Sequence, residues 1–188
     1  MGRIVVTEFI SVDGVIEDPG GSEDFKYGGW SFEFDRGDGG NKFKLDETND
    51  ADALLLGRKT YEGFADAWPS REGEFADKFN SMPKYVVSST LEGPEWNNST
   101  VIGGGDVAGA VAKLKQEQDG LIVVHGSGQL VQALIEADLV DELRLMVFPV
   151  VLGAGQRLFG ETSDRKGLKL TSSETVGDGV TIQVYERA

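Results

Sequence analysis

The stretch LIVVHGSGQLVQALI, residues 121–135, contains a strand, a turn and a helix in immediate succession. Its apolar, β-branched start, Leu121–Val124, has the length and composition of a strand that is buried on both faces. Gly126-Ser127-Gly128 then supplies a turn, and the apolar residues after it recur with the period of an amphipathic helix. A buried strand that passes through a glycine turn into a helix indicates an α/β sheet.

The same alternation of apolar runs and helical stripes continues on the N-terminal side of this stretch. Further strand-like runs are Ile4–Ile10, Ala53–Leu56 and Tyr85–Ser88. Helical periodicity recurs at residues 61–68, which Pro69 closes, and at residues 107–114, which follow Asp106 as a candidate N-cap. Strands that alternate with helices predict a mostly parallel sheet.

The C-terminal part of the chain differs, because its strand-like segments have no helices between them. These segments are Glu142–Phe148, Leu168–Val176 and Val180–Arg187. Gly177-Asp178-Gly179 supplies a hairpin turn between the last two, which predicts antiparallel pairing there. No linker, repeat or low-complexity tract divides the chain, so residues 1–188 are predicted to form a single domain with a mixed sheet.

Composition and charge exclude several classes of function. The 188 residues include 32 acidic and 18 basic side chains, so the formal net charge is −14. Nucleic-acid phosphates and anionic lipids bind clustered Lys and Arg, so we expect no nucleic-acid partner and no membrane partner. The chain has no cysteine and one histidine, His125, which argues against a metal site. The short N-terminal apolar run lacks an export pattern, so the cytoplasm is the expected location.

The first candidate anion site is the turn made by Gly126, Ser127, Gly128 and Gln129. It follows a strand and opens a helix with no carboxylate nearby, so backbone N–H groups and the helix dipole would form a neutral cradle. The alternative is that these glycines serve the geometry of the turn alone. The glycines at 103–105 also fit a dinucleotide fingerprint, but Asp106 places a carboxylate at the next helix N-terminus, and we interpret them as a turn with an N-cap.

The second candidate turn consists of Gly57, Arg58, Lys59 and Thr60. Its two cations open the helix at residues 61–68, where positive charge opposes the macrodipole, and an anionic ligand would offset that cost. The third candidate consists of Ser88, Ser89 and Thr90. These hydroxyls follow the next strand and would add donors for a phosphate monoester, with a serine-rich turn as the alternative.

The segment Glu17–Gly40 is long for an inert connection and is rich in Gly and Asp. It also carries five aromatic residues, Phe25, Tyr27, Trp30, Phe32 and Phe34. Aromatic residues in a glycine-rich loop suggest a lid over a site. The alternative is that they plug the edge of the core.

Five motifs in this order resemble the dihydrofolate reductase-like family, and more closely its branch with the reductase domain of riboflavin biosynthesis. They are Ser11–Gly14, Leu56–Glu62, Val87–Thr90, His125–Leu130 and Phe148–Gly155. The resemblance covers nearly the whole chain. The five motifs together are specific for the family, whereas each of them alone is a weak signal. It implies a three-layer α/β/α domain around a mostly parallel, eight-stranded sheet with an antiparallel C-terminal hairpin.

The resemblance also implies NADPH as the cofactor and a homodimer as the assembly. The Gly126–Gln129 turn would lie on the pyrophosphate, the Gly57–Thr60 turn on the phosphates and the Ser88–Thr90 turn around the adenosine 2′-phosphate. Asp13 is the one ionisable catalytic candidate, acting through water, with an Asp-Gly turn as the alternative. The expected substrate-lining residues are Trp30, Asn41, Leu45 and Trp68.

Two positions depart from the family pattern. The substrate-binding carboxylate of dihydrofolate reductases corresponds to Asn41, and a neutral amide cannot form a charged pair with a protonated pteridine. His125 stands where riboflavin reductases commonly have a glutamate before their glycine pair, and it is either a hydrogen-bonding group or a structural residue. Folate and the riboflavin intermediate are therefore doubtful as substrates.

These features predict an NADPH-dependent reductase. Its hydride would go to a C=N or C=O bond of a small planar heterocycle, pteridine- or pyrimidine-like, or of a small carbonyl compound. The alternatives are a noncatalytic NADP(H)-binding sensor and a homodimeric interaction protein on the same fold.

Overall fold

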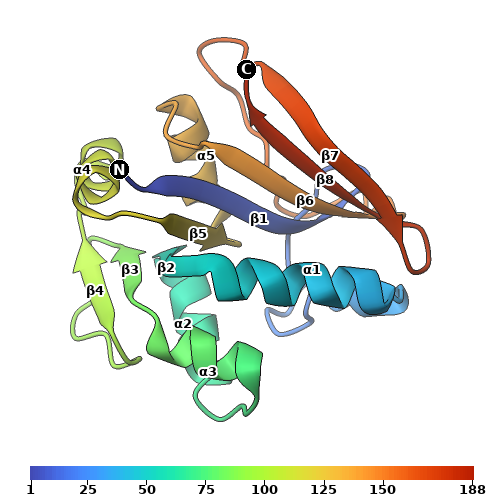
Figure 1. The fold of residues 1–188 in the computed structure, drawn as a ribbon, viewed down its shortest axis with the longest axis horizontal. Coiled ribbons are helices and arrows are strands. Elements are labelled where there is room, and N and C mark those ends of the chain that lie inside the picture. Colours follow the sequence, from blue (N-terminus) through green and yellow to red (C-terminus); the bar gives the residue numbers. More distant parts are fainter.

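A mixed sheet of eight strands runs through the middle of the molecule, which a computed structural model describes over residues 1–188 (Figure 1). The strands are β1 (Arg3–Ser11), β2 (Ala51–Gly57), β3 (Lys84–Val87), β4 (Ser99–Ile102), β5 (Leu121–His125), β6 (Glu142–Phe148), β7 (Leu168–Val176) and β8 (Val180–Arg187). Their order across the sheet is β4-β3-β2-β5-β1-β6-β8-β7. The pairs from β4 to β6 are parallel, whereas β8 is antiparallel to both β6 and β7. The predicted mixed sheet with its C-terminal hairpin is confirmed.

Helices cover both faces of this sheet and complete the predicted three layers. The helices are α1 (Gly37–Asp50), α2 (Arg58–Ala67), α3 (Glu74–Ser81), α4 (Val107–Glu117) and α5 (Gly128–Glu136), with a 3-10 turn η1 (Trp30–Glu33). Figure 1 shows α4 and α5 on one side of the sheet and α1, α2 and α3 on the other. The helices that follow β2 and β5 therefore leave the sheet toward opposite faces.

Two apolar clusters hold the layers together. On the α4–α5 face, Val111 and Leu134 pack with β-strand residues such as Val124 in a buried cluster. On the opposite face, Tyr61 of α2 and Phe79 of α3 pack against the other side of the same strands. Burial of large apolar side chains on both faces explains why the central strands are continuous apolar runs rather than alternating ones.

A third cluster lies under the C-terminal hairpin and decides between the two interpretations of the segment Glu17–Gly40. Trp30 is 1 % exposed, its ring meets Phe148 edge-on at 5.5 Å, and its Nε1–H donates to the Glu17 carbonyl at 2.8 Å. Phe34 also packs on this cluster, whereas Phe32 is 79 % exposed. The lid interpretation is therefore wrong for Trp30, which plugs the edge of the core.

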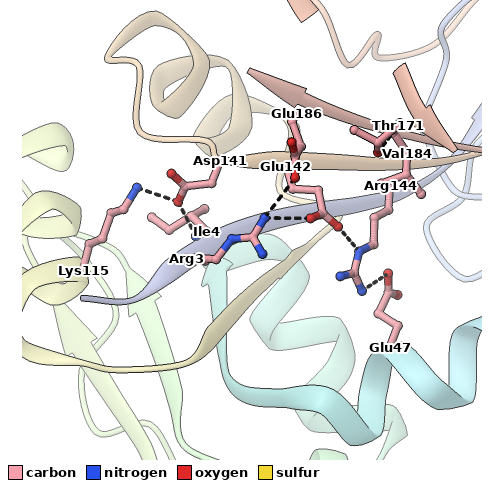
Figure 2. A network of polar contacts seen from close by, with 10 residues as sticks. All are labelled: Arg3, Ile4, Glu47, Lys115, Asp141, Glu142, Arg144, Thr171, Val184 and Glu186. Atoms are coloured by element: carbon pink, nitrogen blue, oxygen red, sulfur yellow. Dashed lines mark hydrogen bonds and ion pairs between the residues drawn. The ribbon is translucent and has the colours of Figure 1, made fainter. Parts of the chain in front are cut away.

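A network of charged side chains fastens α1 to the sheet (Figure 2). Arg144 on β6 lies 2.5 Å from a Glu142 oxygen and 3.5 Å from an oxygen of Glu47 on α1. Arg3 on β1 donates to the other Glu142 oxygen at 2.9 Å. Because Glu47 is almost completely buried, its charge requires a cation, and its pairing with Arg144 fixes α1 on the sheet.

None of the helices has the length and apolar character required to cross a bilayer.

Candidate functional site

The N-termini of α2 and α5 meet where β2 and β5 lie side by side. The two helices then diverge to opposite faces of the sheet, so the loops that open them lie at the carboxyl ends of the strands, at the position where an open α/β sheet has its crevice. In open α/β sheets, ligands bind at such a switch point. Both candidate glycine turns therefore reach the same position from different parts of the sequence.

Hydrogen bonds lock these two turns together. The Gly57 N–H donates to the Ser127 hydroxyl oxygen at 2.9 Å, and the Ser127 N–H donates to Thr60 Oγ1 at 2.9 Å. The Ser127 hydroxyl in turn donates to the His125 carbonyl at 2.9 Å. The Ser127 hydroxyl thus makes its hydrogen bonds within the protein. The groups that the turn can offer to a ligand are therefore those of its backbone.

The backbone of this turn explains its glycines. Gly126 and Ser127 are consecutive left-handed residues, with φ of 52° and 57°. A Cβ on Gly126 would lie 3.0 Å from Thr60 Oγ1, and one on Gly128 would lie 2.6 Å from Gln156 Nε2. The positive φ of Gly126 and its close contact with Thr60 account for glycine there, whereas at Gly128 the flexible end of Gln156 would have to move for a side chain.

The helix N-termini differ in how their N–H groups are satisfied. Asp106 accepts a hydrogen bond from the Gly109 N–H at 2.9 Å and caps α4, as its sequence position indicates. The other four helices have no side-chain cap, and among them α2 and α5 begin at Arg58 and Gly128, in the two glycine turns. Two uncapped helix N-termini therefore face the crevice, and this arrangement suits an anion such as a pyrophosphate.

The two cations of the Gly57–Thr60 turn have different surroundings. Arg58 is exposed and makes no hydrogen bond or ion pair. Lys59 Nζ lies 3.1 Å from the Glu23 carboxylate, so the exposed part of the Glu17–Gly40 segment reaches this turn. Arg58 is the cation free for a phosphate, while Lys59 is shared with Glu23.

The Ser88–Thr90 turn lies at the end of β3, beside the glycines at 103–105. The Ser88 hydroxyl oxygen accepts hydrogen bonds from the backbone N–H groups of Thr90 and Leu91 at 3.1 and 3.0 Å, so it stabilises its own turn. Ser89 and Thr90 are exposed, and a Cβ on Gly104 would lie 2.5 Å from the Ser89 Cβ. The turn thus offers two free hydroxyls rather than the three expected.

Asp13 joins the loop after β1 to the loop after β6. Its carboxylate accepts hydrogen bonds from the Ser11 hydroxyl at 2.6 Å and from the N–H groups of Leu152 and Gly153 at 3.1 and 2.8 Å. The Ser11 hydrogen bond first, and then the two backbone donors, lower the pKa of Asp13 to about 2. The carboxyl is ionised at neutral pH and joins the two loops, and its role as the catalytic candidate that acts through water stays a prediction.

The four expected substrate-lining residues do not share one pocket. Trp30 belongs to the cluster under the C-terminal hairpin, whereas Trp68 stacks on Phe75 beside α3 at a centroid distance of 5.1 Å. Asn41 is exposed on α1, where its Oδ1 accepts a hydrogen bond from the Arg36 Nε at 2.7 Å. Leu45 is half-buried one turn further along α1.

A buried polar group between α1 and the sheet has no counterpart in the sequence-based predictions. Lys44 Nζ donates to Thr7 Oγ1 on β1 at 3.0 Å and lies 2.5 Å from a Glu47 oxygen. Burial, and secondarily the charge of Lys44, lowers the pKa of His125 well below its ordinary value, so its imidazole is neutral. No sequence signal marked Lys44 and Glu47, because charged residues three apart on a helix usually face solvent.

Comparisons with known proteins agree with this architecture. Two proteins of Bacillus subtilis (strain 168), both uncharacterized, cover most of the chain. YyaP is 31% identical over 188 residues, spanning 97% of this chain and 94% of YyaP. YwjB is 32% identical over 179 residues, spanning 95% of this chain and 94% of YwjB.

Solved structures show the same fold at lower identity. A candidate riboflavin biosynthesis protein from Shewanella sp. PV-4 superposes with a TM-score of 0.77 at 24% identity and covers 99% of both chains. A pyrimidine reductase-like protein from Corynebacterium diphtheriae NCTC superposes with a TM-score of 0.63 at 15% identity, covering 99% of this chain and 92% of its own. Residues 3–182 match the RibD C-terminal domain. The chain therefore belongs to the RibD C-terminal domain family, which has a dihydrofolate reductase-like fold.

Proposed function

We propose that this protein is an NADPH-dependent reductase. The observation that carries the proposal is the pair of uncapped helix N-termini, at Arg58 and Gly128, locked side by side at the switch point between β2 and β5. Membership of a family named for a riboflavin biosynthesis domain supports a reductase role. The pyrimidine reductase-like neighbour agrees with a planar heterocycle as the substrate class.

The residues at the crevice fit the cofactor in an extended pose. The Gly126–Gln129 turn would hold the pyrophosphate through backbone N–H groups, because its two glycines carry no side chain that would stand in the way. Arg58 would meet a phosphate with its free guanidinium, and Ser89 and Thr90 would meet the 2′-phosphate with their hydroxyls. Lys59 would exchange its Glu23 partner for a phosphate oxygen.

Bound NADPH would supply the hydride, and the protein would orient it against a C=N or C=O bond of the substrate. Asp13 would contribute by holding the backbone of Leu152 and Gly153 to the loop after β1. The neutral imidazole of His125 can accept or donate a hydrogen bond without adding charge. Asn41 supplies no carboxylate, so a protonated pteridine is disfavoured relative to a neutral heterocycle or carbonyl compound.

The test is substrate-dependent oxidation of NADPH. Purified protein with NADPH is offered a panel of pteridines, pyrimidines and small carbonyl compounds, and the absorbance of the reduced nicotinamide is followed. A reductase oxidises NADPH only when its substrate is present. Binding of NADPH without oxidation by any compound favours the second candidate, a noncatalytic sensor, which the surface pairing of Asn41 with Arg36 supports.

We propose in addition that the protein forms homodimers. The outer strand of the hairpin, β7, is exposed from Leu168 to Thr175, and Leu170 on it is 51 % exposed. Unpaired edge strands with exposed apolar side chains are normally protected, and a second copy would cover this edge. Light scattering after size exclusion tests this, with Leu170→Lys expected to shift the dimer toward monomer and a monomeric wild type contradicting it.

A further inference from the structure

Residues 18–29, between β1 and η1, form a closed surface loop. The Gly29 N–H donates to the Asp18 carbonyl at 2.9 Å, so the two ends of the loop meet. Inside the loop, the buried Asp18 carboxylate accepts hydrogen bonds from the N–H groups of Ser22 and Phe25 at 2.7 and 3.3 Å. Compact loops whose ends meet in this way are Ω-loops, and they are frequently functional.

The base of the Ω-loop lies against the Gly126–Gln129 turn. Glu17, the residue before the loop, accepts a hydrogen bond on its carboxylate from the Gln156 N–H at 2.8 Å. The side chains of Ile16 and Gln156 both reach Gly128, because a Cβ there would lie 3.0 Å from Ile16 Cδ1 and 2.6 Å from Gln156 Nε2. The loop therefore starts beside the turn that would hold the pyrophosphate.

The far side of the Ω-loop reaches the Gly57–Thr60 turn. Glu23 Oε2 lies 3.1 Å from Lys59 Nζ. Lys59 is the second residue of α2, where the helix dipole favours a negative charge nearby. The loop thus extends from Gly128 at its base to Lys59 at its far side, and so it contacts both turns of the proposed cofactor site.

Glu23 opposes the binding of an anion at this site. The chain carries a net charge of −14, and Lys59 is one of the two cations in the Gly57–Thr60 turn, so a carboxylate that pairs with it lowers the local positive potential. The hydrogen bonds of Asp18 close the loop without Glu23, so the shape of the loop does not require this ion pair. Glu23 instead holds the cation that a phosphate would use.

We propose that the Ω-loop is an autoinhibitory strap: Glu23 holds Lys59 in the free protein, and a phosphate of the incoming dinucleotide displaces it. The inference rests on the proposed function and adds regulation of the same site. A dinucleotide that also meets Arg58 and the backbone N–H groups of the turns binds at several points, whereas Glu23 contributes one carboxylate. Because the side chains of Glu23 and Lys59 are 37 % and 73 % exposed, the exchange is inexpensive and reversible.

The test is a double-mutant cycle on the dissociation constant of NADPH, with the wild type, Glu23→Gln, Lys59→Ala and the double variant. Glu23→Gln keeps the shape of the side chain and removes its charge, so affinity should rise about two- to fivefold, the range that one exposed ion pair provides. In the Lys59→Ala background the same substitution should have no effect, because the carboxylate then has no cation to withhold.

Asp24→Asn is the matched control, because it removes one negative charge from the next position of the same loop. Asp24 is exposed, forms no ion pair and has a φ of 61°, a conformation that Asn also tolerates. Its substitution should leave the dissociation constant unchanged. An equal gain in Asp24→Asn and Glu23→Gln, or a gain from Glu23→Gln that persists in Lys59→Ala, would overturn the strap, because net charge alone would then explain the effect.

A second measurement works without any ligand. Lys26 is exposed on the Ω-loop, so trypsin cleavage after it reports how often the loop leaves Lys59. Cleavage should be about two- to fivefold faster in Glu23→Gln and in Lys59→Ala than in the wild type, and unchanged in Asp24→Asn. Equal rates in all four proteins would overturn the strap.

The two measurements separate failure of the strap from failure of the proposed function. NADPH binding that does not respond to Glu23→Gln overturns the strap and leaves the cofactor site standing. The absence of NADPH binding in every variant overturns the proposed function, and with it the competition between Glu23 and a phosphate, even where cleavage after Lys26 responds as expected.

Discussion

Ser127 shows how single residues build the crevice. Its left-handed backbone aims its N–H at Thr60, and its hydroxyl bridges the Gly57 N–H and the His125 carbonyl. That the two glycine turns would meet could be predicted, because the carboxyl ends of parallel strands share one edge of the sheet. The hydrogen bonds of the Ser127 hydroxyl could not be predicted, because its partners lie up to 70 residues away in sequence.

Arg58 and Lys59 should distinguish NADPH from NADH. Replacing both by alanine removes charge-assisted hydrogen bonds to phosphate, so NADPH affinity should fall by roughly tenfold or more, while NADH affinity changes little. Calorimetric titration measures both. Arg165→Ala is the control, because it removes an exposed arginine that lies outside the proposed cofactor-binding turns. Equal weakening of both dinucleotides would contradict a role for Arg58 and Lys59 in the preference for NADPH.

Asp13 should stabilise the fold only while it is ionised. Its pKa of about 2 lies below its ordinary value of 3.8, so its contribution is complete above about pH 3.8 and is lost as pH falls through 2. Asp13→Asn should be less stable than the wild type at pH 7 by about 1–3 kcal/mol in urea unfolding, because hydrogen bonds to a charged acceptor are lost. The difference should vanish near pH 2. Asp66→Asn, an exposed carboxyl on α2, should show neither effect.

Among the elements, α1 is the one whose packing the sequence pattern conceals. The strands and the helices α4 and α5 carry apolar stripes with clear periods, and these could be predicted. The buried face of α1 instead carries Lys44, Glu47 and Thr48, which have no apolar period to detect. Their burial depends on Thr7 and Arg144, partners on distant strands.

The buried ion pair of α1 predicts a specific pattern of unfolding energies. Lys44→Met leaves Glu47 buried with one weaker partner, so stability should fall by roughly 3–5 kcal/mol. The double variant Lys44→Met/Glu47→Leu removes both charges and should recover most of that loss. Urea unfolding of the four members of the cycle measures the coupling. Additive losses would mean that the two side chains do not act as a pair.

At the scale of the molecule, the strand order places a cation-bearing crevice on an otherwise acidic protein. The net charge of −14 repels anions in general, and the crevice at β2 and β5 is where Arg58 and two helix N-termini oppose that field. The mixed sheet and hairpin were predictable from strand character. The substrate pocket was not, because Trp30 and Trp68 separate into different clusters only in three dimensions.

Thermal unfolding with and without NADPH or NADH tests most directly that the crevice binds a dinucleotide. A ligand at about 100 times its dissociation constant adds roughly 2.7 kcal/mol, which for a chain of this size raises the melting temperature by about 5–10 °C. We predict that rise with NADPH and a smaller one with NADH at equal concentration. An unchanged melting temperature with both dinucleotides at millimolar concentration would contradict a cofactor site at this crevice.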